Sequence, residues 1–356
     1  SWNWLANGTA PTKTYKVVVV SDSGNKYRFR NSADDATFAQ SAVTLDLQEG
    51  GTYTFDWSDS SAQGHPIRFS LTSDGTHGGG SEYTTGVVKD DSAYTTTITI
   101  ASGVATLYYY CQNHSGMGGQ INTNTTFGST NFDGSILSVS NPNTTSGFSI
   151  VTYTGTGSSA TVGHGLGKAP NMSIIKPRNF ADNWIVTYDM VDGSDDQVYL
   201  NLTNAGGSPS ASFVVAQNAT TLGLTDWNNV NDASDTYVAY CFAEVEGFSK
   251  FGSYTGNGSD DGTFVYTGFR PARVMTKSYT NSVTKWVIVD NERSPFNTNG
   301  IYLASDDVAG DGTGIEVDFL SNGFKWRQTG SWTNANNYGY IYMAFAENPF
   351  KYANAR

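Results

Sequence analysis

The chain has 356 residues, enough for two or three domains that each bury a core of their own. Its formal net charge is -12 at pH 7, so it lacks the positive field that attracts nucleic acid, and neither DNA nor RNA is expected as a partner. No apolar run approaches the roughly 20 residues of a membrane-spanning helix, so membrane insertion is not expected. The two cysteines, Cys111 and Cys241, lie far apart in the sequence, which argues against a disulfide framework.

Short strands joined by turns are predicted along the whole chain, because Gly, Thr, Ser, Asn and Tyr are abundant and only 15% of the residues are charged. The first part alternates apolar and polar residues with the period of two that is typical of strands. This alternation predicts strands at residues 14–20, 26–30, 43–47, 53–57, 94–100 and 106–110. We therefore predict an all-β fold, with two sheets packed face to face in this part.

Beyond residue 146 the sequence repeats itself with a period of about 100 residues. For example, the residues Tyr-Thr-Gly at 153–155 recur at 254–256. A copy of this length, with many turn signals and no helical period, suits one β-sandwich. We therefore predict two tandem β-sandwich repeats, at residues 147–246 and 247–356.

Four residues of the first part form the side-chain set of a mononuclear copper site: His65, Cys111, His114 and Met117. A thiolate and two imidazoles with a weak axial thioether suit an ion that cycles between cuprous and cupric states. The spacing Cys-x2-His-x2-Met places three of these ligands on one tight loop at the end of a predicted strand. We therefore expect all four side chains to converge on one point.

The segment LDLQEGGTYTFDWSDSSAQGHPIRFS, together with the ligand loop, resembles the cupredoxins, and the loop has the short length found in amicyanin. The resemblance implies a cupredoxin-like β-sandwich over residues 11–123, with His65 and His114 as imidazole ligands, Cys111 as the thiolate and Met117 as the axial ligand. The chain departs from the family at Gly64, where some soluble electron carriers have Asn. This departure weakens the inference of electron transfer more than that of copper binding.

Two alternatives remain for this constellation. Cysteine, histidine and methionine also occur as ordinary core and loop residues, so the site can be unoccupied or a metal-free relic. Zinc is the rival ion because it accepts Cys and His, but it has little use for the thioether of Met117. The only other histidines, His77 and His164, are predicted to be solvated loop residues, which leaves too few imidazoles for a multicopper oxidase.

The C-terminal segments HGLGKAP, YCFAEVEGFSKFGSYTGNG, FLSNGF and MAFAENPFKYANAR resemble a domain common in tail-fibre and appendage proteins of marine bacteriophages. The resemblance covers residues 147–356. It implies a virion structural protein, such as a tail fibre, spike or capsid-surface appendage, exposed on an extracellular particle. Its implied partners are other virion proteins, further copies of the chain in a homo-oligomer such as a trimer, and a host-surface glycan or receptor.

The opening SWNWLANGTA and the later NFDGSILSVSNPNTTSGFSI look like one continuous lead-in of that family. On this interpretation, residues 1–10 and 124–146 are a split lead-in, and the copper-type domain is inserted between its halves. The two ends of an inserted domain should lie close together in space.

Three tryptophans in polar, Asn-rich surroundings are candidates for stacking on glycans: Trp227, Trp326 and Trp332. The competing expectation places them in the core or in subunit contacts. No nucleophile with a partner at recognisable spacing is found, so the chain is not expected to be an enzyme. The alternative to a structural role is a copper-binding redox module that the β-sandwich domains anchor. A third possibility is that the copper-type domain serves only stability.

Overall fold

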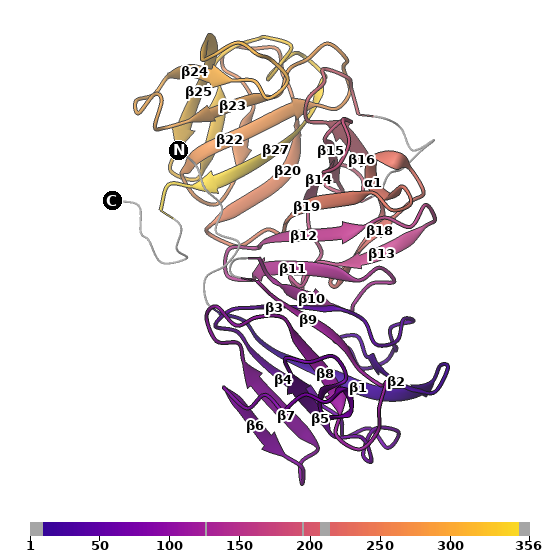
Figure 1. The fold of residues 1–356 in the computed structure, drawn as a ribbon. Helices are drawn as coiled ribbons and strands as arrows, with labels where there is room; N and C mark the ends of the chain where they lie inside the picture. Colours follow the sequence, from indigo (N-terminus) through magenta and orange to yellow (C-terminus); the bar gives the residue numbers. More distant parts are fainter. Residues whose placement is uncertain (1–9, 125–126, 194–195, 207–213, 349–356) are drawn as a thin grey trace.

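The computed structural model describes residues 10–124, 127–193, 196–206 and 214–348. Within these ranges nearly all regular structure is strand, and the all-β prediction is confirmed. Figure 1 shows the strands in three successive parts, which we call the N-terminal unit (residues 10–124), the first repeat (residues 147–246) and the second repeat (residues 247–348). No helix in the described part of the chain has the length and apolar character needed to cross a membrane.

The N-terminal unit consists of two sheets. One has the order β2-β1-β4-β7-β6 and the other the order β3-β9-β8-β5. β1 runs parallel to β4 and β3 runs parallel to β9, while the other neighbours are antiparallel. The strands are β1 (Thr12–Ser21), β2 (Asn25–Phe29), β3 (Leu45–Gln48), β4 (Thr52–Asp56), β5 (Ile67–Ser70), β6 (Val87–Asp90), β7 (Thr95–Thr99), β8 (Leu107–Cys111) and β9 (Gly119–Asn124).

An aromatic core fills the space between these two sheets. Tyr53 and Phe55 of β4 are fully buried, as their spacing of two residues predicts, and Phe69 and Tyr109 of the other sheet join the same core. The Phe55 ring lies 5.2 Å from the Phe69 ring and 6.5 Å from the Tyr109 ring, measured between centroids. Large apolar rings thus hold β5 and β8 against the opposite sheet.

The two repeats have the same strand order, although the strands of the first lie in two sheets and those of the second form one continuous sheet. Among the described residues each contributes eight strands, and the order β12-β19-β14-β15-β16 with β17-β18-β13 in the first matches β20-β27-β22-β23-β24-β25-β26-β21 in the second. The first set is β12 (Phe148–Thr154), β13 (Ala160–Gly163), β14 (Met172–Pro177), β15 (Ile185–Tyr188), β16 (Asp196–Tyr199), β17 (Val214–Gln217), β18 (Thr221–Leu224) and β19 (Thr236–Phe242). The second is β20 (Ser249–Thr255), β21 (Phe264–Tyr266), β22 (Pro271–Ser278), β23 (Val287–Asp290), β24 (Asn299–Leu303), β25 (Gly312–Leu320), β26 (Gly323–Trp326) and β27 (Gly339–Ala346).

One buried asparagine occupies the same place in both repeats. The Oδ1 atom of Asn231 accepts the Thr156 N–H at 2.9 Å, and the Oδ1 atom of Asn334 accepts the Asn257 N–H at 3.1 Å. Each Nδ2 atom donates to two backbone carbonyls of its own repeat. Both side chains are fully buried, so the duplication extends from strand order to individual hydrogen bonds.

The segment predicted as the second half of the lead-in contributes strands to the first repeat. β10 (Ser129–Asn131) and β11 (Ser138–Asn143) extend its sheet, because β11 pairs with β12 along six residues and β10 pairs with β11. The next residue, Phe132, is buried in the core of the N-terminal unit, where its ring stacks on Phe29 at 4.7 Å between centroids. This segment therefore joins the two parts instead of separating them. Residues 1–9 lie outside the described residues.

Candidate metal centre

Strand pairing brings the first two predicted ligands together. Cys111 is the last residue of β8 and stands opposite Ile67, the first residue of the neighbouring strand β5. His65 precedes β5 by two residues, so it lies beside Cys111 at the same end of the sheet. The Gln112 N–H donates to the Pro66 carbonyl at 2.9 Å and continues the pairing past the strand ends.

Three donor atoms converge there. The Sγ atom of Cys111 lies 3.7 Å from Nδ1 of His65 and 3.6 Å from Nδ1 of His114, and the donor atoms of all three residues lie within 4.8 Å of one another. An ion about 2.3 Å from a thiolate and about 2.0 Å from an imidazole, at a near-trigonal angle, places those two atoms about 3.7 Å apart. The observed spacings therefore fit one small transition-metal ion held by these residues.

Met117 lies at the far end of the same loop. Its side chain is fully buried in the core that also contains Cys111. Its carbonyl accepts the Tyr27 N–H at 3.0 Å, which ties this end of the loop to β2. The structure thus brings His65, Cys111 and His114 together and places Met117 on the inner side of the loop that carries two of them.

Glycines allow the ligand loop to fold this sharply. Gly116 has φ +71, a left-handed conformation that other residues adopt only with strain. A Cβ atom on Gly118 would lie 1.8 Å from the Tyr109 carbonyl oxygen, so no other residue fits there without moving the backbone. The tight turn between β8 and β9 is what returns His114 and Met117 toward Cys111.

The surroundings of His65 favour the form that binds metal. Partial burial, and then the nearby His114, lower the pKa of His65, so its imidazole tends to be neutral with a free electron pair. Its carbonyl accepts a hydrogen bond from the Tyr27 hydroxyl at 2.6 Å. Burial, and then Cys111, raise the pKa of Tyr27, which keeps that hydroxyl protonated as a donor.

The three donors differ in their access to solvent. Cys111 is buried, His65 is half-buried and His114 is exposed. An ion held by these residues would be connected to the surface through the exposed His114 imidazole, while the Cys111 sulfur would remain shielded from solvent.

Two polar contacts around the site were not foreseen from the sequence. The Asn113 amide donates to the Gly64 carbonyl at 3.1 Å and links the two ligand-bearing segments. Asn113 stands directly before His114, the second of the two predicted imidazole ligands. The other contact is made by His77, whose Nε2 atom donates to the Cys111 carbonyl at 3.0 Å. His77 is exposed, as predicted, but it is bonded to a predicted ligand residue.

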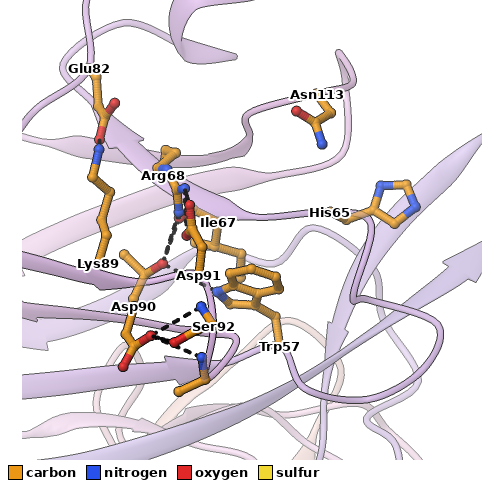
Figure 2. A network of polar contacts seen from close by, with 12 residues as sticks. Trp57, His65, Ile67, Arg68, Glu82, Lys89, Asp90, Asp91, Ser92 and Asn113 are labelled. Atoms are coloured by element: carbon orange, nitrogen blue, oxygen red, sulfur yellow. Dashed lines mark hydrogen bonds and ion pairs between the residues drawn. The ribbon is translucent and has the colours of Figure 1, made fainter.

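Arg68 anchors the strand that follows His65 (Figure 2). Its side chain is only 2% exposed, and its Nη2 atom contacts both carboxylate oxygens of Asp91 at 2.7 and 2.8 Å. Its Nη1 atom donates to the Ile67 carbonyl at 2.9 Å. A buried arginine with these partners fixes the start of β5, and therefore the backbone next to His65. A charged residue between the apolar residues Ile67 and Phe69 was the sequence signal for it.

The tryptophans predicted to stack on glycans are not equivalent. Trp326 is fully buried in the core of the second repeat, so its prediction as an exposed stacking residue is wrong. It alternates with Phe324 along β26, and this period of two directs both rings inward. Trp227 is 44% exposed. Trp332 is partly buried, with the Lys285 ammonium 5.0 Å from its ring.

The prediction that His164 is solvated is also wrong, because its side chain is fully buried. Its Nε2 atom donates to the Asn218 carbonyl at 3.0 Å, and its Nδ1 atom accepts the Leu166 N–H at 3.2 Å. Burial lowers the pKa of His164. Both ring nitrogens are hydrogen-bonded to backbone groups of the first repeat, so the role of His164 is structural.

A family model described as a domain of unknown function (DUF7483) matches residues 121–349. No curated protein and no solved structure matches the chain. The matched range contains both repeats and the segment with β10 and β11. All four predicted metal ligands precede it.

Proposed function

The chain belongs to the family of the domain of unknown function DUF7483 through residues 121–349, and we propose separate roles for that part and for the unit in front of it. The N-terminal unit is a cupredoxin-like module that binds one copper ion through His65, Cys111, His114 and Met117. The observation that carries this proposal is the convergence of Cys111 Sγ with the Nδ1 atoms of His65 and His114 at 3.7 and 3.6 Å.

The donor set favours copper over other ions. Thiolate and imidazole suit both zinc and copper, but a buried thioether on the same loop is a ligand type that copper uses and zinc seldom does. Bound copper supplies one-electron redox chemistry. The residues of the chain exclude water from Cys111, keep the His65 imidazole neutral and expose His114.

The repeats form the body of a virion structural protein, such as a tail fibre, spike or capsid-surface appendage. The sequence motifs of residues 147–356 support this proposal by their resemblance to phage appendage proteins. The architecture agrees with it, because two copies of one β-fold follow each other along the molecule (Figure 1). The expected partners are other virion proteins and further copies of the chain. The exposed Trp227 is the stacking residue best placed for host-surface glycan recognition.

A redox module anchored by the repeats is the second candidate. The exposed His114 favours it, since electron exchange with a partner needs a ligand edge at the surface. Reversible reduction of the copper-loaded chain, with rapid exchange to a redox partner, would support this role. If the site takes up copper but the copper is not reversibly reduced and oxidised, the role of the metal is structural.

Copper titration of the full chain tests the metal proposal. A ligand that binds only the folded state raises the melting temperature, so we expect uptake of one copper ion per chain and a higher Tm than with zinc at equal concentration. An unchanged Tm at excess copper would reject the copper site. The structural role is tested independently by mass spectrometry of purified particles and by a map of the particle, which should show the chain at the surface.

A further inference from the structure

A short segment between β5 and β6 contacts both ends of the ligand loop. It consists of Asp74 and the 3₁₀ helix η1 (Gly75–Gly78). At one end of the loop, the Oδ1 atom of Asp74 accepts the Gly116 N–H at 2.8 Å. At the other end, Nε2 of His77 donates to the Cys111 carbonyl at 3.0 Å. These two side chains, three residues apart, reach loop positions next to Met117 and at Cys111.

We propose that Asp74 and His77 form a clasp that positions the ligand loop, so that the Cys111 thiolate is held against the two imidazoles before any metal binds. The inference rests on the proposed metal site for the purpose of the clasp, and on the hydrogen bonds of Asp74 and His77 to the loop backbone for its mechanism. Neither residue is a metal ligand. Each acts through the backbone of a residue that is a ligand or adjoins one.

The clasp fixes the peptide plane that follows Cys111. The carbonyl oxygen of this peptide accepts from His77, and its N–H, on Gln112, donates to the Pro66 carbonyl. With both polar atoms of the plane bonded, the Cys111 backbone cannot rotate without losing a hydrogen bond. Because the Sγ atom is attached to this backbone through a single Cβ, its position relative to the imidazoles is restricted as well.

The opposite end of the loop is held in the same way. The Gly116 N–H donates to the Asp74 carboxylate, a charge-assisted bond that is stronger than a neutral one. The Gly116 carbonyl accepts from the Lys26 ammonium, and the Met117 carbonyl accepts from the Tyr27 N–H. Met117 is thus approached from two sides, by the clasp and by β2.

The backbone of the clasp has a strained conformation at Asp74, and packing against Tyr110 supports it. Asp74 has φ 58, an uncommon value for a residue other than glycine. Gly75 follows with φ 56, and a Cβ atom there would lie 2.4 Å from the ring of Tyr110, the residue before Cys111. The His77 ring meets the same Tyr110 ring edge-on, at 6.3 Å between centroids. The segment is therefore seated on β8 at the strand end that carries the thiol.

The experiment compares four variants of the full chain. His77→Phe keeps a ring against Tyr110 but removes the hydrogen bond, and His77→Gln retains a donor. Asp74→Ala removes the other end of the clasp. Thr76→Ala is the matched control, because this exposed residue lies in the same helix and, among the described residues, its side chain makes no hydrogen bond to the loop. The two ends are tested separately, so a folding defect in one variant leaves the other to decide.

The first measurement needs no metal. It follows the reaction of Cys111 with an aromatic disulfide reagent, with the buried Cys241 as the internal reference. We expect His77→Phe and Asp74→Ala to raise the Cys111 rate well beyond twofold, because a loosened loop gives the reagent access to the buried thiol. His77→Gln and Thr76→Ala should react like the natural chain. Equal rates in all variants, within twofold, would overturn the clasp.

The second measurement uses cupric ion. His77→Phe and Asp74→Ala should bind it about tenfold more weakly than the natural chain and shift the thiolate-to-copper absorption bands, while Thr76→Ala does neither. Unchanged affinity and bands in both clasp variants would also overturn the inference. Failure of the natural chain to take up copper would instead reject the proposed metal site, and the thiol rates would still decide whether the clasp exists.

Discussion

The N-terminal unit and the two repeats place side chains with hydrogen-bonding or metal-binding atoms in different ways. In the repeats, Asn231 and Asn334 direct the hydrogen-bonding atoms of the side chain at their own loops, and in both copies Oδ1 accepts one backbone N–H while Nδ2 donates to two backbone carbonyls. In the N-terminal unit, Cys111 and two imidazoles are directed at one another. An asparagine that recurs in both repeats and bonds only to its own repeat maintains the fold. The thiol and imidazoles of the N-terminal unit have no counterpart in the repeats and face one another, which is the arrangement of a metal-binding site.

The boundary of the family model follows the same division. Residues 121–349 contain both repeats, and the ligands lie before them. Yet the two regions are physically joined, because Phe132, inside the matched range, is buried in the aromatic core of the N-terminal unit. The N-terminal unit and the repeats therefore differ in the chemistry of their side chains, but they do not pack independently of each other. The predictions that follow test this comparison from the largest expected effect to the smallest.

Replacement of Phe132 by Ala should have the largest effect. It removes a ring that stacks on Phe29 and meets Tyr15 edge-on, at 4.7 and 5.5 Å between centroids. Deletion of a buried Phe side chain costs about 3–5 kcal/mol, so the free energy of unfolding of the N-terminal unit should fall by about this amount. Chemical denaturation followed by tryptophan fluorescence measures it. A loss below about 1 kcal/mol would show that the two regions are not coupled through this ring.

Asn334→Ala and Asn231→Ala should destabilise their repeats by similar amounts. Each leaves one backbone N–H and two backbone carbonyls without their side-chain partner, which costs about 3 kcal/mol. Denaturation curves of the two variants give the comparison, and the copper-bound spectrum should be the same in both. A large cost in only one repeat would contradict the interpretation of a shared structural role.

Met117→Leu sharpens the assignment of the axial ligand. Leu has a similar volume, so the loss of stability should stay below about 1.5 kcal/mol. The remaining three donors should still bind copper, but removal of a thioether donor to the cupric state should raise the reduction potential. A redox titration measures the change. An unaltered potential would remove Met117 from the ligand set.

His164→Gln is distinguished from the other variants by a change in the pH dependence of stability. The folded-state pKa of His164 is lowered, so below its unfolded value of about 6.5 the unfolded chain binds more protons than the folded one. The free energy of unfolding contributed by this neutral, buried imidazole is therefore present above that pH and is lost as the pH falls. Denaturation curves at several pH values should show a weaker decline on the acid side in the variant. An identical decline would contradict the lowered pKa.

The fold class and the duplication could be predicted because each produces a regular pattern in the sequence. The period of two in residues 53–57 and the recurrence of Tyr153 at Tyr254 need no knowledge of the third dimension. The clustering of Cys111 with His114 was predictable for the same reason, since the two residues share one short loop.

What the sequence did not reveal depends on contacts between distant segments. The clasp at Asp74 and His77 requires two successive residues with positive φ, a conformation that composition alone does not predict. Trp326 was predicted to be exposed because its neighbours in the sequence are polar. The alternation that directs its ring inward extends over only four residues of β26. The sequence of β11 resembles that of a linker, but the segment forms a strand because it pairs with β12.

The central claim is that the N-terminal unit holds copper through Cys111, and the paramagnetic resonance of the cupric chain tests it most directly. We expect a blue protein with the narrow copper hyperfine splitting of a thiolate-bound ion. Both features should be lost in Cys111→Ser and retained in Cys241→Ser, whose sulfur lies in the core of the first repeat. A colourless natural chain with stoichiometric copper, or a Cys111→Ser variant that stays blue, would contradict the claim.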